Sequence, residues 1–371
     1  MFPVHSIRVL AVVVIALMIA GCAKDVPVLS IWAPLPDLPA DLAAIKLTTE
    51  GQTTAAYTLL ELGSTGGFNG FVIINSDGQP VWFFRTTGSP SGFVRRSNGN
   101  FVFLDTGAGL LEVTPGQSVV HSLPQQLKPG RGMHHDLSLS NDNTILFLAH
   151  EWGAHRDTLI NGAAIWEWNP ENGSEKKRWS SLDMLDTSLD RGGRSVDEDW
   201  LHENSLSLSP AGNIIISFHF LNQIVSLSPD FQKIQWRFGG TRRTIAVTDS
   251  FSGQHTGQEI APNHILMFDN GFERTVEKFS RTVEFEISDS SANVVWQWRP
   301  ERDNWARVIG GARRLPNGNT FVTFGVPKDQ PPGSTGPIEA YEVTLAGKVV
   351  WHLTVSGTVG FMYRATPLFY F

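Results

Sequence analysis

The sequence has little cysteine and little charge, and each shortage excludes a class of protein. Its 371 residues include a single cysteine, Cys22, so no internal disulfide can form. Charged residues make up only 18%, and 36 acidic residues outnumber 29 lysines and arginines, which gives a formal net charge of −7. This balance argues against a protein that binds nucleic acid, because no long basic cluster offsets it.

The sequence also lacks an apolar run long enough to cross a bilayer. The longest candidate, Val9 to Ala20, follows Arg8 and has about 12 residues, whereas a transmembrane helix needs about 20. Small residues precede Cys22 in the stretch IAGC, so residues 1–21 predict a lipoprotein signal peptide and Cys22 its lipid anchor. An ordinary signal peptide with an incidental cysteine is the alternative. We therefore expect an exported protein, held to a membrane by its N-terminal lipid and facing the periplasm or the cell surface.

Glycine, proline and tryptophan are plentiful, which suits many short strands joined by turns. Six units repeat one plan, in which an alternating strand leads through a turn such as Asn-Gly to further strands. The units cover residues 70–85, 93–123, 134–180, 202–240, 253–298 and 308–354. A tryptophan near the end of five units is expected to pack between neighbouring sheets: Trp82, Trp166, Trp236, Trp296 and Trp351.

Each of the six units is long enough for about four strands, which predicts an all-β fold, a six-bladed β-propeller. A large β-sandwich is the alternative, which the regular spacing of like units disfavours. Residues 22–56 are rich in Pro, Ala and Thr and predict a lipid-anchored tether with an edge strand. The propeller domain then covers 57–371, and its last segment, 360–371, is expected to supply a closing strand for the first blade.

Aligning the units on their turns places several polar residues at one level. His134, Asn204 and His255 each lie nine residues before the equivalent post-turn position of three consecutive units. His202 precedes Asn204 by two residues and belongs to the same strand face. Because the first strand of each propeller blade lines the central axis, these side chains are expected to converge near one mouth. A hydrogen-bonded core or surface role is the simpler interpretation of each alone, but four at one level favour a site.

Three other histidines, His150, His155 and His352, do not share this level and are expected to be structural or surface residues. Histidine with asparagine suits metal binding or nucleophilic catalysis by one imidazole. The group lacks the carboxylates that metal-dependent hydrolases and lyases often add, so we expect no metal and no cofactor. Asp136 would point away from a regular strand face, and it would orient a neighbouring ring only through a backbone bend; a turn or blade contact is the alternative.

Several motifs resemble the arylsulfate sulfotransferase family, bacterial propeller enzymes that do not use the nucleotide sulfate donor. The matching stretches are AYTLLE (56–61), DGQPVW (77–82), HHD (134–136), DWLHENSLSLSPAGNIIIS (199–217), WRFGG (236–240), QH (254–255), FDNG (268–271), FSRTVEFEI (279–287) and LPNGNTFVTFG (315–325). They run in order along most of the chain. The resemblance implies the same six-bladed fold, an aryl sulfate donor and a phenolic acceptor.

The resemblance also implies a role for each matched position. His255 corresponds to the histidine that attacks sulfur and carries a transient sulfo group. His202 and Asn204 correspond to donors around the sulfuryl oxygens. One histidine of the HHD pair corresponds to another active-site histidine: motif position favours His135 and the repeat alignment favours His134.

The chain departs from the family pattern after IIIS, where the family has an arginine in S-x-R and this sequence has His219. His219 is expected to bind as a donor or cation, without the permanent charge and bidentate fork of arginine. Sulfate binding would then weaken above about pH 6.5 for an ordinary imidazole. Arg281 could supply the missing charge, and a strand-edge surface arginine is the alternative.

Longer family members also carry an N-terminal β-domain for which this sequence has no room. Dimerisation through that domain is therefore not expected, and the oligomeric state stays open. The missing arginine leaves a second hypothesis, a binding or scaffold propeller without catalytic activity. A metal-dependent hydrolase or lyase that uses the histidines is the third.

Overall fold

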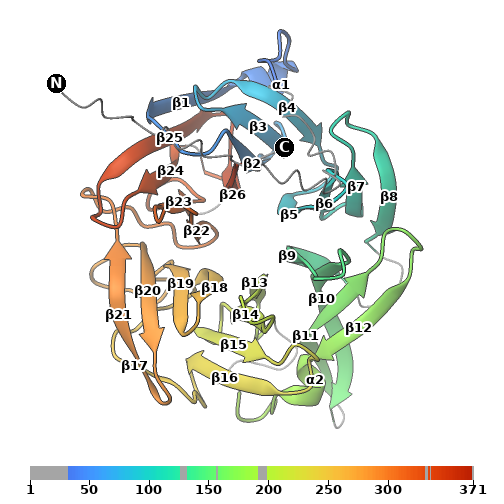
Figure 1. Ribbon diagram of the computed structural model, residues 1–371, viewed down its shortest axis with the longest axis vertical. Helices are drawn as coiled ribbons and strands as arrows, with labels where there is room; N and C mark the ends of the chain where they lie inside the picture. Colours follow the sequence, from blue (N-terminus) through green and yellow to red (C-terminus); the bar gives the residue numbers. More distant parts are fainter. Residues whose placement is uncertain are drawn as a thin grey trace, which may run out of the picture.

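The computed structural model describes residues 32–125, 132–155, 158–190, 199–330, 333–334 and 336–369. These residues form six sheets arranged as blades around a central axis (Figure 1). The all-β, six-bladed β-propeller expected from the repeats is therefore confirmed. The expected signal peptide and Cys22 lie outside the described residues. Where the chain is described, no helix has the length and apolar character required to span a membrane.

Within each blade the strands are ordered from the axis to the rim. The first blade holds β26 (Phe361–Leu368), β2 (Tyr57–Gly63), β3 (Gly70–Asn75) and β4 (Pro80–Arg85). The second holds β5 (Pro90–Arg95), β6 (Phe101–Asp105), β7 (Gly109–Val113) and β8 (Val119–Pro124). The third holds β9 (Met133–Leu139), β10 (Ile145–His155), β11 (Thr158–Trp168) and β12 (Glu175–Ser180).

The other three blades follow the same order. The fourth holds β13 (Glu203–Leu208), β14 (Ile214–Phe218), β15 (Gln223–Leu227) and β16 (Ile234–Gly239). The fifth holds β18 (His255–Ala261), β19 (His264–Asp269), β20 (Arg281–Ile287), β21 (Ser291–Trp298) and the short parallel β17 (Ala246–Val247). The sixth holds β22 (Gly311–Arg314), β23 (Thr320–Phe324), β24 (Ile338–Val343), β25 (Val349–Gly357) and β1 (Ile45–Gly51). Two short helices in the described residues are α1 (Ala40–Ala43) and α2 (Ser181–Met184).

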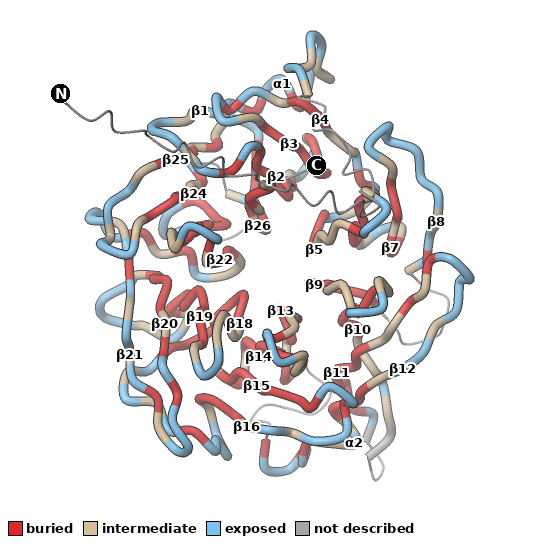
Figure 2. The backbone as a smooth tube through the Cα atoms, in the orientation of Figure 1, coloured by how far each residue is buried: buried red, intermediate tan, exposed pale blue. Residues whose placement is uncertain are grey.

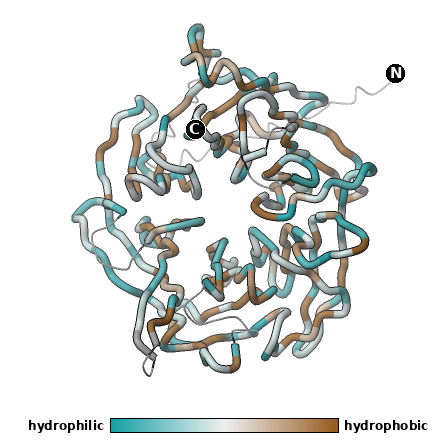
Figure 3. Tube along the Cα trace, turned by 180° about the vertical axis from the view of Figure 1, so that it is seen from behind, coloured by the Kyte–Doolittle hydropathy of each residue, from teal (hydrophilic) through white to brown (hydrophobic). Residues whose placement is uncertain are grey.

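Burial along the strands explains their sequence patterns. Every residue of β6 (FVFLD) is buried, because blades one and three cover the two faces of this strand. In β25, near the rim of blade six, buried and less buried residues alternate because one face is more open. Figure 2 shows buried residues concentrated in the inner part of the blades and exposed residues more frequent at the rim, and Figure 3 shows hydrophobic and hydrophilic stretches alternating along the chain.

Six clusters of buried apolar side chains lie between the blades, each shared by two neighbours. Between blades one and two, the rings of Phe71 and Phe103 stack with centroids 4.0 Å apart. Trp82 packs in the same cluster, and Trp351 packs between blades six and one, as expected for both. Trp166 lies on the third strand of its blade rather than the last, because β10 and β11 form an unusually long hairpin that delays the fourth strand.

Both described ends of the chain join blades at the closure of the ring. β26 pairs with β2, so the closing strand expected from residues 360–371 is confirmed. β1 pairs with β25 along its whole length and forms the outer edge of blade six. Since one end completes blade one and the other extends blade six, opening the ring there requires breaking two strand ladders.

Candidate active site

Residues at the beginning of three innermost strands, the first or the second of each, lie at the same mouth of the axis. His134 is on β9, Asn204 on β13 and His255 on β18, so the alignment of the repeats identified equivalent positions. Six imidazole rings follow one another there, with neighbouring centroids 4.0, 4.8, 4.6, 5.4 and 5.4 Å apart. We call this row the histidine arc; in order it comprises His150, His134, His135, His202, His219 and His255.

Bulges at the starts of these strands aim the rings. The strand registers shift between Phe147 and Ala149 on blade three, Glu203 and Ser205 on blade four, and His255 and Gln258 on blade five. His135, His202 and Thr256 have positive φ angles of 61°, 50° and 52°, a backbone state that costs about 1–3 kcal/mol in a residue other than glycine. The bulges break the regular alternation of side chains, so adjacent residues such as His134 and His135 reach one site.

His255 is held by acceptors. Its Nδ1 lies 2.8 Å from Oδ1 of Asn270 and 3.2 Å from the carbonyl oxygen of Gly253. The Asn270 amide nitrogen donates to the carbonyls of Ala306 and Ile309, which identifies its oxygen as the acceptor. Nδ1 of His255 therefore carries the hydrogen, and Nε2 carries the lone pair. Burial lowers the pKa of His255 to about 3, so its ring is neutral at pH 7.

His202 is paired with a carboxylate. Its Nδ1 contacts Oδ2 of Asp199, and its backbone N–H donates to Oδ1 of the same carboxylate at 2.9 Å. Burial would raise the pKa of Asp199, but the hydrogen bond and charge from His202 outweigh it and lower the pKa. An aspartate that fixes Nδ1 and supports the imidazolium leaves Nε2 available to give or take a proton.

Both histidines of the HHD pair face the site. The Nδ1 atoms of His134 and His135 are 2.7 Å apart, close enough to share one hydrogen. The ring of His135 continues the arc to His202 and lies 6.1 Å from the ring of Tyr363. Burial lowers the pKa of His134 to about 3 and that of His135 well below its usual range. The sequence left open which of His134 and His135 faces the site, and in the structure both do.

Below the arc, Asn204 and Asp136 bind an arginine. The Arg364 guanidinium donates to Oδ1 of Asp136 at 2.6 Å and to the backbone oxygen of Asn204 at 3.1 Å. Asp136 also accepts from the backbone N–H of Leu206, so it orients Arg364 and not a histidine ring. The Asn204 side chain is fully buried and donates to the carbonyl of Gln254 at 2.7 Å, which fixes the residue just before His255.

His219 lies between His202 and His255 in the arc. Its buried ring packs against Phe220 and Phe272, with centroids 4.9 and 4.8 Å away. The exposed Arg307 places its guanidinium carbon 4.4 Å from the centroid of Phe272. Two aromatic rings and a permanent cation thus lie beside this end of the arc.

From the sequence, Arg281 was a candidate to replace the arginine charge that is missing at His219. In the structure its guanidinium binds other residues. Its guanidinium pairs with Asp249 at 2.7 Å and Asp269 at 3.0 Å, and it donates to Gln297. It is buried, so it is not a strand-edge surface residue either. These partners tie β20 to the loop ahead of β18 and leave Arg281 a structural role.

Of the histidines set aside from sequence, one belongs to the site. The ring of His150, on β10, lies 4.0 Å from that of His134, so His150 lies in the arc from which the turn alignment had left it out. The bulge between β9 and β10 shifts the register and brings β10 up beside His134, which the turn alignment could not show. His352 stacks on Tyr341 in blade six, away from the arc. The side chain of His155 lies outside the described part of the chain.

A cavity of about 190 Å³ lies between the inner strands of the six blades. Glu61, Asp136, Arg313 and Arg364 line it together with apolar and hydroxyl side chains. Burial raises the pKa of Glu61 to about 8, despite the positive charge of Arg364 and a hydrogen bond from Gly92. The molecule therefore has a histidine-rich mouth and a channel that carries carboxylates and arginines.

Sequence reasoning missed four polar residues of the mouth: Asp199, Glu203, Asn270 and Arg364. Asp199, Glu203 and Asn270 lie inside stretches that the resemblance had already identified, DWLHENS and FDNG. Spacing relative to His202 and to the strand that follows His255 could have marked them. Arg364 is on the closing strand, about which no local motif gave a signal.

The arylsulfotransferase (ASST) family model matches residues 49–364. No curated protein matches the chain. Among solved structures, a protein of unknown function from Bacteroides caccae shares 13% identity with a TM-score of 0.57, covering 86% of this chain and 99% of its own. A chain of a nidogen/laminin complex shares 9% with a TM-score of 0.50 (84% and 97% covered). Virginiamycin B lyase from Staphylococcus aureus shares 10% with a TM-score of 0.44 (84% and 99% covered). At these identities the first two likenesses concern the fold alone.

Proposed function

Since this chain belongs to the arylsulfotransferase family, we propose that it moves a sulfuryl group from an aryl sulfate to a phenolic acceptor through a sulfohistidine at His255. One observation carries the proposal: Nδ1 of His255 is held by two carbonyl-type oxygens, which leaves the lone pair on Nε2 of a neutral ring. A neutral imidazole nitrogen is a competent nucleophile, and no base is needed to activate it.

In the first half-reaction, Nε2 of His255 attacks the sulfur of the donor. The N–S bond forms as the bond from sulfur to the aryl oxygen breaks, and the phenolate leaves with the electron pair. The sulfated ring keeps its hydrogen on Nδ1 and becomes cationic. The oxygens of Asn270 and Gly253 accept from Nδ1 and stabilise that charge.

His202 is the general acid of this proposal. Its imidazolium, supported by the carboxylate of Asp199, gives the Nε2 proton to the departing phenolate. In the second half-reaction the same nitrogen takes the proton of the acceptor phenol. The phenolate oxygen then attacks sulfur, the N–S bond breaks, and neutral His255 is regenerated, which gives ping-pong kinetics.

Groups around His219 and His135 suit the rest of the substrate. Imidazole N–H groups of these residues are donors for the sulfuryl oxygens, where negative charge develops. Phe220 and Phe272 offer faces for the aryl ring, and Arg307 adds a permanent cation that His219 lacks. Asn204 serves as a positioning residue, since it holds the carbonyl next to His255.

The direct test is the mass of the intact protein after brief incubation with 4-nitrophenyl sulfate and no acceptor. We expect a gain of one SO₃ group in the wild type, no gain in His255→Ala, and loss of the group on adding phenol. His121→Ala is the control, because His121 lies on the outer strand β8, far from the mouth. An unmodified wild type would contradict the proposal and leave a binding propeller.

The location of the protein is part of the same proposal. A lipid on Cys22 would hold the propeller at a membrane surface and leave the mouth open to exported aryl sulfates and phenols. Extraction of the wild type and Cys22→Ala from intact cells tests it: we expect detergent-dependent release of the wild type only. Detergent-independent release of both would contradict the anchor.

A further inference from the structure

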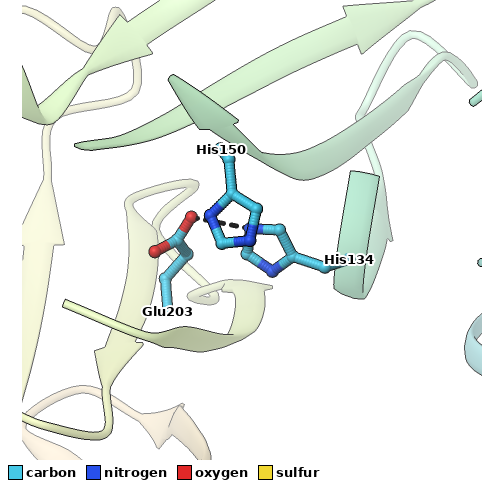
Figure 4. Close-up of side chains that lie close together, drawn as sticks. All are labelled: His134, His150 and Glu203. Atoms are coloured by element: carbon cyan, nitrogen blue, oxygen red, sulfur yellow. Dashed lines mark ion pairs between the residues drawn. The ribbon is translucent and has the colours of Figure 1, made fainter. Parts of the chain in front are cut away.

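The end of the histidine arc away from His255 faces a carboxylate. His134, His150 and Glu203 come from three different strands, β9, β10 and β13, and meet between blades three and four (Figure 4). One ligand-type atom of each lies within 4.8 Å of those of the other two. We call these residues the His-His-Glu triad. Of its three residues, only His134 was assigned to the sulfuryl-transfer site by the family resemblance.

Two atoms of the triad are buried without a good hydrogen bond. Nε2 of His134 and Oε1 of Glu203 lie 3.0 Å apart, an ion-pair distance, yet neither makes a well-aligned hydrogen bond within the described part of the chain. Their residues are only 8% and 1% exposed. Burying such atoms unsatisfied is costly, and a shared cation would satisfy both at once.

We propose that the His-His-Glu triad binds one divalent first-row transition-metal ion, with Zn²⁺ as the expected occupant. Two imidazole nitrogens and one carboxylate form a donor set that such ions favour and that Mg²⁺ and Ca²⁺ do not. Ligand atoms on a tetrahedral ion lie about 3.4 Å apart for bonds of about 2.1 Å. The triad would close by about an ångström to reach this, and half-buried His150 is the member with room to move. Three protein ligands leave one position for water or for an oxygen of a bound molecule.

An ion on Nε2 of His134 has a consequence for the next ring. Nδ1 of His134 must then keep its hydrogen and donate it to Nδ1 of His135, 2.7 Å away. His135 in turn carries its own hydrogen on Nε2. The ion would thereby fix the tautomers of both rings, as outer-shell hydrogen bonds do around metal-bound histidines.

The chain contains a matched comparison for this site. On blade five, His264 Nδ1 lies 2.7 Å from Oε1 of Glu284, so the pair reproduces the His–Glu contact. No second histidine joins this pair among the groups found in the described residues, and Arg314 already neutralises Glu284. His264→Ala therefore removes a histidine–glutamate pair of the same kind without touching the triad.

The experiment is metal analysis of the purified full chain after chelation, incubation with Zn²⁺ and removal of free ion. We expect one zinc per chain in the wild type and in His264→Ala. Affinity should fall at least about 100-fold in Glu203→Gln and His150→Ala, since each removes a ligand. Co²⁺ in place of Zn²⁺ should give a visible absorption band that the two triad variants lack.

Folding is monitored separately, so a variant that fails to fold cannot be mistaken for loss of the site. Glu203→Gln keeps the shape of the side chain, and its Tm without metal should stay near that of the wild type, while the rise in Tm on adding Zn²⁺ disappears. The proposal is overturned if the wild type takes up neither Zn²⁺ nor Co²⁺, or if folded Glu203→Gln and His150→Ala keep wild-type metal content. None of these readouts depends on sulfuryl transfer.

Discussion

The two ends of the histidine arc use one residue type in opposite surroundings. At one end Nδ1 of His255 is hydrogen-bonded to carbonyl-type oxygens, from Asn270 and Gly253. At the other end the rings of His134 and His150 meet the carboxylate of Glu203. An amide oxygen fixes a tautomer without adding charge, so it leaves a neutral ring with a lone pair on Nε2; a carboxylate adds the charge that attracts a cation. The partner, and not the histidine, decides what each end can do.

The largest effect that this comparison predicts is on the rate of transfer. His255→Ala should lower kcat/KM for 4-nitrophenyl sulfate and phenol by at least about 10⁴-fold, because it removes the nucleophile. His150→Ala, at the other end of the arc, should lower it less than about tenfold. Initial rates of nitrophenol release measure both. Equal losses in the two variants would show that the ends do not have separate roles.

Placing a carboxylate beside His255 tests whether the partner group decides the difference between the two ends of the arc. Asn270→Asp keeps the acceptor for Nδ1 but adds negative charge, which raises the pKa of His255 from its buried value of about 3. Activity needs the neutral ring, so the acid limb of the pH–rate profile should move to higher pH. At pH 6 we expect a loss of about 10–100-fold, shrinking as pH rises.

A serine control separates charge from shape in that experiment. Asn270→Ser also loses the bonds to Ala306 and Ile309 but adds no charge, so its rate should fall without a shift of the acid limb. If the acid limb moves equally in both variants, the absence of charge at position 270 is not what keeps His255 neutral.

A smaller effect should come from Arg307, which gives the His255 end a permanent cation. Arg307→Ala should raise KM for the aryl sulfate about five- to tenfold with little change in kcat, because an exposed charge steers and binds the anion without touching the transfer step. Arg307→Lys should restore most of the affinity. Added salt should weaken binding to the wild type more than to Arg307→Ala, and a drop in kcat alone would contradict this role.

The sequence predicts those parts of the structure that depend on residues close together in the chain. The turns that end at Asn143, Asn213 and His264 are local, and aligning them was enough to predict that His134, Asn204 and His255 lie at one mouth. The side chains that complete the site depend on bulges and on contacts between blades. His150 is an example, because only the shifted pairing of β9 with β10 brings its ring to His134.

Charges were the hardest feature to predict from sequence. Arg281 lies in a matched motif and seemed available, yet Asp249 and Asp269 occupy its guanidinium. Arg364 lies in no motif, yet the closing strand β26 brings it next to Asp136, more than 200 residues away. Ion pairs between distant strands leave no periodic trace in a sequence, so they appear only in three dimensions.

The comparison extends from the arc to the channel, where Glu61 is a buried carboxylate and the expected effect is on stability and not on activity. Burial lowers the pKa of His255 from 6.5 to about 3 and raises that of Glu61 from 4.5 to about 8. The unfolded chain therefore binds the histidine proton below pH 6.5, and stability falls as pH drops from 6.5 towards 3. Conversely, unfolding releases the Glu61 proton above pH 4.5, and stability falls as pH rises from 4.5 to 8.

Each group changes the free energy of unfolding by up to about 1.4 kcal/mol per pH unit between its folded and unfolded pKa values. Between pH 4.5 and 6.5 the two groups change the free energy of unfolding in opposite directions. The contribution of Glu61 is therefore measured as the difference in that free energy between a Glu61 variant and the wild type. Glu61→Gln cannot ionise and keeps an acceptor for the Gly92 N–H, so relative to the wild type it should gain stability steadily from pH 4.5 to 8 and not beyond. Urea unfolding with chelator present measures that difference. A constant offset across this range would mean that the channel carboxylate ionises as freely in the folded protein as in the unfolded chain, and that burial does not act oppositely on the acid and the base.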